Sequence, residues 1–113
     1  MPRYMISFDE GTMIFTPEEL PELARASMAV VRAAQAAGVW VFGGGLIHQG
    51  RQVVATDGSV TDYVGDAVEE KALGGFSIVD VPTRQEALEW AARIAVSCRC
   101  PQKVHELMPD PQV

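Results

Sequence analysis

The chain has 113 residues, of which 48% are hydrophobic and 21% charged, and its formal net charge at pH 7 is −6. This length and apolar content predict a single domain over residues 1–113 with a buried core, and they exclude disordered and fibrous proteins. No apolar run approaches the roughly 20 residues that cross a bilayer, and the nine Lys and Arg are scattered singly. We therefore expect no nucleic-acid partner and no membrane partner. The N-terminus lacks the apolar stretch of a secretory signal, so the expected location is cytoplasmic.

The first third of the chain predicts a strand, a helix and a strand. Residues 3–9 alternate in polarity as a strand does. Thr16 and Glu19 have the spacing of a capping box, and the helix that they open is expected to end at Gly38. The β-favouring run at residues 39–42 predicts a strand that is covered on both faces.

Turn signals dominate the middle of the chain. The glycine triplet at residues 43–45 predicts a bulge, a sharp bend, or the close approach of another backbone or a ligand. Asp57 and Gly58 lie between two short β-favouring runs at residues 52–55 and 59–64, a pattern that strongly indicates a hairpin.

The last third repeats the order strand, helix, strand. A short helical turn is expected at residues 67–73, followed by a strand at 76–81. Thr83 opens a second capping box, and its helix is expected to run to about Ala95. Residues 102–108 predict the final strand.

This order of elements predicts an α+β, ferredoxin-like fold, in which two strand–helix–strand halves form one antiparallel sheet. Right-handed crossovers place both helices on one face of that sheet. The other face lacks a cover within the chain, and we expect a homodimer to bury it. Depending on strand register, that face would carry Met5, Ser7, Trp40 or Val41, Val79 or Ile78, and Val104 or His105.

The chain resembles the YCII-related proteins, and specifically their DGPF-domain branch. Four segments carry the resemblance: RYMISF at residues 3–8, AAGVWVFGGGL at 36–46, LGGFSIVDV at 73–81 and EALEWAARI at 86–94. The resemblance implies a dimeric α/β barrel whose two sheets face each other. It also implies a regulatory setting, because members of this branch are often encoded beside extracytoplasmic-function sigma factors.

The tract that gives the branch its name is altered here. Thr61 and Asp62 match its start, but residues 63–65 read Tyr-Val-Gly where the family has Gly-Pro-Phe. Residues 69–71 keep the acid-and-lysine character of the tract. A His–Asp pair is suggested as the catalytic site in other branches of the superfamily, and no motif places that pair on this chain.

His48 and Asp62 are the candidate catalytic residues. An imidazole titrates near neutral pH, and a carboxylate near it could orient it as a general base. The alternatives are a polar residue at a strand end for His48, and an acid that caps the following turn for Asp62.

Candidate ligand-binding residues surround the glycine triplet: Trp40, Phe42, Gly43, Gly44 and Gly45. Their aromatic rings either line an apolar pocket or belong to the core. Asp9 lies two residues after Ser7 and so shares its face of the strand if the strand extends that far. It is then a buried carboxylate of the uncovered face, and otherwise it is an acid in the following turn.

Neither a metal nor a cofactor is expected. Cys98 and Cys100 are too close in sequence for an easy disulfide, so we expect reduced thiols. Together with His105 they supply only three soft ligands, where structural zinc sites usually have four. The glycine triplet lacks the context of a nucleotide-binding motif.

Three functional classes remain open. The first is a dimeric small-molecule-binding or regulatory protein, which we take as the leading hypothesis. The second is a cofactor-free enzyme that uses a His/Asp acid–base pair in a barrel cavity. The third is a purely structural partner module, and fold alone does not choose among them.

Overall fold

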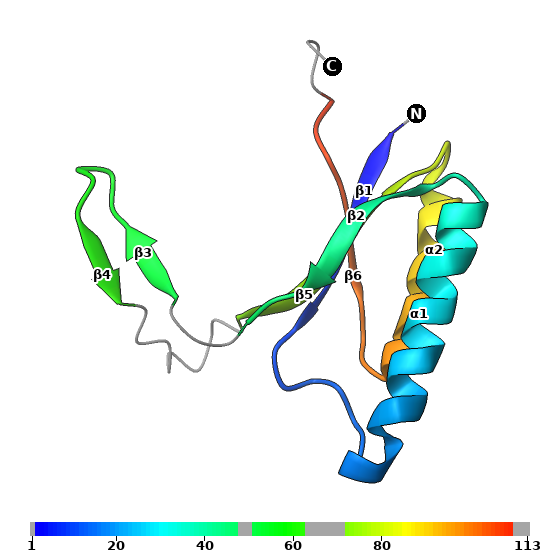
Figure 1. Cartoon of the computed structure of the whole chain (residues 1–113). Helices are drawn as coiled ribbons and strands as arrows, with labels where there is room; N and C mark the ends of the chain where they lie inside the picture. Colours follow the sequence, from blue (N-terminus) through cyan, green and yellow to red (C-terminus); the bar gives the residue numbers. More distant parts are fainter. Residues whose placement is uncertain (1, 48–50, 63–71, 110–113) are drawn as a thin grey trace.

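A computed structural model describes residues 2–47, 51–62 and 72–109. It contains six strands, two α-helices and one short 3-10 helix (Figure 1). In chain order these are β1 (Arg3–Asp9), η1 (Pro17–Glu19), α1 (Leu20–Ala36), β2 (Trp40–Gly45), β3 (Gln52–Val54), β4 (Val60–Asp62), β5 (Leu73–Asp80), α2 (Arg84–Cys98) and β6 (Lys103–Glu106).

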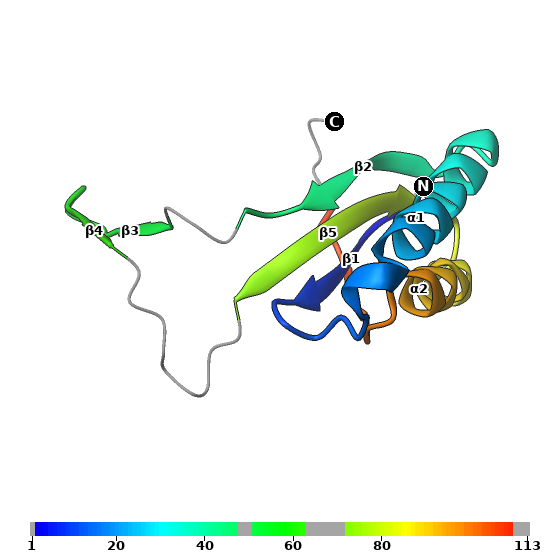
Figure 2. The same cartoon turned by 60° about the horizontal axis from the view of Figure 1, so that its bottom comes forward.

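Four of the strands form one sheet in the order β2-β5-β1-β6, and every neighbouring pair is antiparallel. Both helices lie on the same face of this sheet (Figure 2). This is the strand order of the ferredoxin-like fold, and it confirms the α+β class expected from the sequence. Strands β3 and β4 pair with each other in a separate hairpin.

The core lies between the sheet and the helices. It contains Tyr4 and Ile6 of β1, Val79 of β5, and Ala87 and Ala91 of α2, all of them buried. The small alanines let α2 approach the sheet closely, so the larger strand residues fill the space between the two layers.

Both predicted caps are present. The backbone N–H of Thr16 donates to Glu19 Oε1 at 2.9 Å, and the backbone N–H of Glu86 donates to Thr83 Oγ1 at 3.2 Å. Gly38 follows the end of α1 with a φ of +74°. A glycine adopts this left-handed conformation without a steric penalty, and it ends the helix as predicted.

The second helix is longer than predicted. It continues past Ala95 to Cys98, because the residue that ends it is Arg99, which takes a left-handed φ of 57°. No sequence pattern predicts that an arginine will adopt the left-handed backbone conformation, so this helix end was not foreseen. Leu88, although apolar, is exposed on the surface of this helix.

The second strand includes the glycine triplet and contains a bulge between Trp40 and Phe42. Gly43 is required by close packing, since a Cβ there would lie 2.6 Å from Phe76 O and 2.9 Å from the ring of Trp40. Of the predicted explanations for the triplet, the close approach of another backbone is present at Gly43, whereas the bulge lies just before the triplet.

The structure also bears on the segment before β5 and on the expectation of no membrane span. The helical turn expected at residues 67–73 lies largely outside the described residues, and Leu73 belongs to β5. In the described part of the chain, neither helix has the length and apolar content that a bilayer span requires.

Candidate functional site

The face of the sheet opposite the helices is left without a covering element in the described part of the chain (Figure 2). Alternation along the strands places one set of side chains on this surface, which we call the open face. Strand pairing assigns to it Met5, Ser7 and Asp9 of β1, Phe76 and Ile78 of β5, Phe42 and Gly44 of β2, and Lys103 and His105 of β6.

The β2 and β5 half of the open face is apolar. The rings of Phe42 and Phe76 lie 6.0 Å apart between centroids and are tilted by 51°. Phe42 is 64% exposed, although it is a large aromatic residue. Ile78 lies opposite Phe42 on one side and opposite Met5 on the other. An apolar centre of this kind in water is typical of an interface or a ligand cavity.

The β1 and β6 half of the open face is polar. Ser7 is only 3% exposed, and Lys103 lies directly opposite it in the ladder. Lys103 Nζ is 3.0 Å from Asp9 Oδ2. His105 lies opposite Met5, next to the apolar centre. A hydroxyl, an imidazole and an ion pair therefore border the aromatic residues.

Asp9 is the last residue of β1 rather than part of a following turn, and its side chain is partly buried, with 15% of it exposed. Its carboxylate is paired rather than isolated. The pairing residue Lys103 was missed in the sequence because it is 94 positions away and has no local signal.

The charges at the edges of the open face cancel. Arg3 Nε is 3.8 Å from Asp80 Oδ2 at one end, and Lys103 pairs with Asp9 at the other. The described open face is therefore close to neutral, although the chain as a whole has a net charge of −6. Two such faces can approach each other without the repulsion that the average charge would cause.

The candidate ligand residues are divided between the two sides of the sheet. Phe42 and Gly44 lie on the open face, and a Cβ at Gly44 would meet nothing within 4 Å. Trp40 lies on the helix side, where its ring packs over Gly43. Gly45 pairs with Gly75, also on the helix side.

The two candidate catalytic residues are not seen together. His48 lies outside the described residues, as do residues 63–71 of the altered family tract. Asp62 is the last residue of β4, is exposed, and accepts a hydrogen bond from Gln52 Nε2 at 3.5 Å. It belongs to the hairpin, away from the open face (Figure 1).

The cysteines and His105 occupy separate environments. Cys98 Sγ is 3.4 Å from Ser27 Oγ, between the two helices, and both thiols are free. Burial raises the pKa of the Cys100 thiol, which keeps it protonated and unreactive. Within residues 2–47, 51–62 and 72–109, no three His, Cys, Asp or Glu side chains gather as metal ligands.

A concave surface lies between the helices. This groove has a volume of about 630 Å³ and is mainly apolar, with small residues such as Ala26, Ala29 and Ala92 in its walls. It contains none of the candidate site residues, so it does not bring the predicted chemistry together.

A comparison with known families assigns the chain to a family. The family model of the YCII-related domain matches residues 3–97, which is most of the chain. This chain is a member of the YCII-related family. A search of curated proteins found no match.

The YCII-related match ends before β6. Lys103 and His105 therefore lie beyond the matched residues, while Met5, Ser7, Phe42, Phe76 and Ile78 lie within them. The apolar half of the open face comes from the part of the chain that defines the family, and much of the polar half comes from the part that follows.

Proposed function

We propose that this YCII-related chain is a homodimeric small-molecule-binding protein in which the open faces of two copies enclose the ligand. The observation that carries the proposal is the open face itself. It combines the exposed ring of Phe42 and the partly buried ring of Phe76 with a buried hydroxyl and an imidazole, and the described chain leaves it uncovered.

The surface of the chain supports a dimer. Helices cover only one face of the four-stranded sheet, and Phe42 on the other face is 64% exposed. An apolar surface that is bordered by polar groups and neutralised charges is typical of an interface.

The lining indicates the class of ligand. Phe42, Phe76 and Ile78 offer an apolar surface with aromatic faces, and Ser7 and His105 offer a few hydrogen-bonding groups. Ligand sites commonly have this composition, in which apolar contacts supply affinity and a few polar groups fix orientation. We infer a small molecule with an apolar body and one or two polar groups.

Binding is better supported than catalysis. A general base is normally oriented by a second group that holds its ring. The imidazole of His105 makes no hydrogen bond or ion pair with the described residues, and the carboxylate of Asp9, on the same face, is engaged by Lys103. The His48–Asp62 pair remains a prediction, because Asp62 lies on the hairpin and contacts Gln52.

Titration with anilinonaphthalene sulfonate, an apolar fluorescent anion, tests the site. Gly44→Phe places a ring over open space beside Phe76, so the chain should fold and the probe should bind at least about 10-fold more weakly. The matched control, Ala92→Phe, fills the groove between the helices and should leave the affinity unchanged. Unchanged probe binding in Gly44→Phe, with native circular dichroism, would contradict the proposed site.

A further inference from the structure

We propose that the β3–β4 hairpin is an arm that packs against a second copy of this chain, with Val54 and Val60 as its contacting side chains. This inference rests on the homodimer proposed above and assigns it a second contact region, outside the open face.

The hairpin stands away from the rest of the molecule. Figures 1 and 2 both show it separated from the sheet and the helices. All its residues from Gln52 to Asp62 are exposed. The chain has a radius of gyration of 15.9 Å, compared with about 13 Å for a compact chain of this length.

The hairpin has a regular hydrogen-bonded turn and is not an irregular loop. In its turn, Gly58 N–H donates to Ala55 O at 2.9 Å and Ala55 N–H donates to Ser59 O at 2.8 Å. Ser59 N–H donates to Asp57 Oδ1 at 2.9 Å, and the hydrogen bonds from Ser59 hold the pKa of Asp57 below its usual value. Since a lone two-stranded hairpin is marginally stable in water, this arm needs a surface to pack against.

One side of the arm is suited to such a contact. Val54 and Val60 are directly opposite each other in the ladder, and they are 66% and 60% exposed. Cross-strand pairs of this kind form a small continuous apolar patch. The other side carries the mixed pair Val53 and Thr61.

The base of the arm lies beside the proposed interface. Arg51 Nη2 is 3.4 Å from Glu10 Oε2, directly after the end of β1. The arm leaves the sheet between the end of β2 and the start of β5, where Leu46 N–H donates to Gly74 O at 2.9 Å. Because β2 and β5 form the apolar half of the open face, a copy bound there lies within reach of the arm. This continuity favours a second copy over an unrelated partner.

Substitutions on the two sides of the arm test the proposal by sedimentation equilibrium. The double variant Val54→Lys, Val60→Lys should raise the dissociation constant of the dimer at least about 100-fold, because each dimer loses four apolar contacts. The matched control, Val53→Lys with Thr61→Lys, adds the same charge to the other side and should change the constant by less than about 3-fold. Equal effects of the two double variants would overturn the assignment.

Crosslinking then identifies the surface that the arm touches. A benzophenone side chain at position 60 is activated in a mixture of ¹⁴N- and ¹⁵N-labelled chains. Crosslinks between differently labelled chains are expected. Crosslinks confined to single chains would overturn the arm contact.

The two proposals fail in different ways. A wild-type chain that stays monomeric at all concentrations would overturn the dimer, and the arm with it. A wild-type dimer whose dissociation constant is the same in both double variants would overturn the arm alone.

Discussion

Two neighbouring glycines in β2 have opposite surroundings. A Cβ at Gly43 would lie 2.8 Å from Ser77 Cα and closer still to Phe76 O, whereas a Cβ at Gly44 would meet nothing within 4 Å. The backbone atoms of β5 cannot move away without breaking the ladder. Gly43 is therefore required for folding, and Gly44 leaves space on the open face.

We expect Gly43→Ala to lower the free energy of unfolding by roughly 2–3 kcal/mol, since overpacking in a core costs about 1–3 kcal/mol and this clash is with backbone. Gly44→Ala should raise it by about 0.5 kcal/mol, because alanine loses less entropy in a strand. Urea unfolding of both variants at one fixed protein concentration measures the difference. Similar losses in the two variants would contradict the described packing of β2.

The sequence predicted a structural role for the glycine triplet but not the role of each glycine. That distinction depends on the bulge between Trp40 and Phe42, which sets the face to which each later residue points. The same bulge explains why the open face carries Phe42 rather than Trp40 or Val41. Strand alternation alone does not reveal a bulge.

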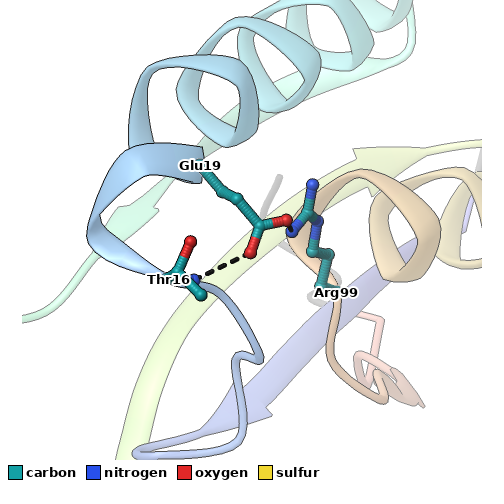
Figure 3. A network of polar contacts seen from close by, with 3 residues as sticks. All are labelled: Thr16, Glu19 and Arg99. Carbon is teal, nitrogen blue, oxygen red and sulfur yellow. Dashed lines mark hydrogen bonds and ion pairs between the residues drawn. The ribbon is translucent and has the colours of Figure 1, made fainter.

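At the scale of elements, an ion pair joins the start of α1 to the end of α2. Glu19, at the end of η1, pairs with Arg99, which follows α2, and also accepts the hydrogen bond from Thr16 N–H (Figure 3). The carbonyl oxygen of Arg99 accepts a hydrogen bond from Ile14 N–H at 3.2 Å. Arg99 thus ties the loop before α1 to both helices.

This ion pair predicts a pH dependence of stability. The hydrogen bond from Arg99, assisted by Thr16, lowers the pKa of Glu19 from 4.5 to about 2. The unfolded chain therefore takes up this proton first as the pH falls. The stabilisation is present above about pH 4.5 and is lost progressively between pH 4.5 and 2.

Glu19→Gln should reduce the slope of unfolding free energy against pH in that range. The control is Glu22→Gln, which removes an exposed pair with Arg25 inside one helix and should leave the slope nearly unchanged. Urea titrations between pH 2 and 6 measure both slopes. Equal slopes in the wild type and Glu19→Gln would rule out this role for the pair.

The cap of α2 gives a second prediction for an element. Thr83→Ala removes the acceptor for Glu86 N–H and should lower the free energy of unfolding by about 1 kcal/mol. Thr83→Ser keeps the hydroxyl and should restore most of the stability. Loss of the same size in Thr83→Ser would show that the methyl group, not the cap, is responsible.

At the scale of the whole molecule, the sequence predicted the fold well because two capping boxes and the alternating strands are local signals. The two β-α-β halves predict the ferredoxin-like fold, whose strand order β2-β5-β1-β6 the structure shows, and the rule for crossover handedness predicts that both helices lie on one face. Contacts between distant residues, such as Lys103 with Asp9 and Arg99 with Glu19, have no local signal and were missed.

The candidate site was predicted only in part. Phe42 and Gly44 lie on the open face as candidate ligand contacts, and Met5, Ser7 and His105 lie there as the strand alternation allowed. Asp62 lies instead on the hairpin, because Thr61 and Asp62 complete the β3–β4 ladder before the chain returns to the sheet. Nothing in the local sequence indicates how far that hairpin stands from the body.

The central claim is that a second copy covers the open face. The face is apolar over β2 and β5, and its two charged pairs are neutralised, so it is expected to be covered by association. Multi-angle light scattering of the wild-type chain at micromolar concentration tests this directly. We predict a mass twice the 12.2 kDa of the chain, and a mass of 12.2 kDa at every concentration would contradict a covered open face.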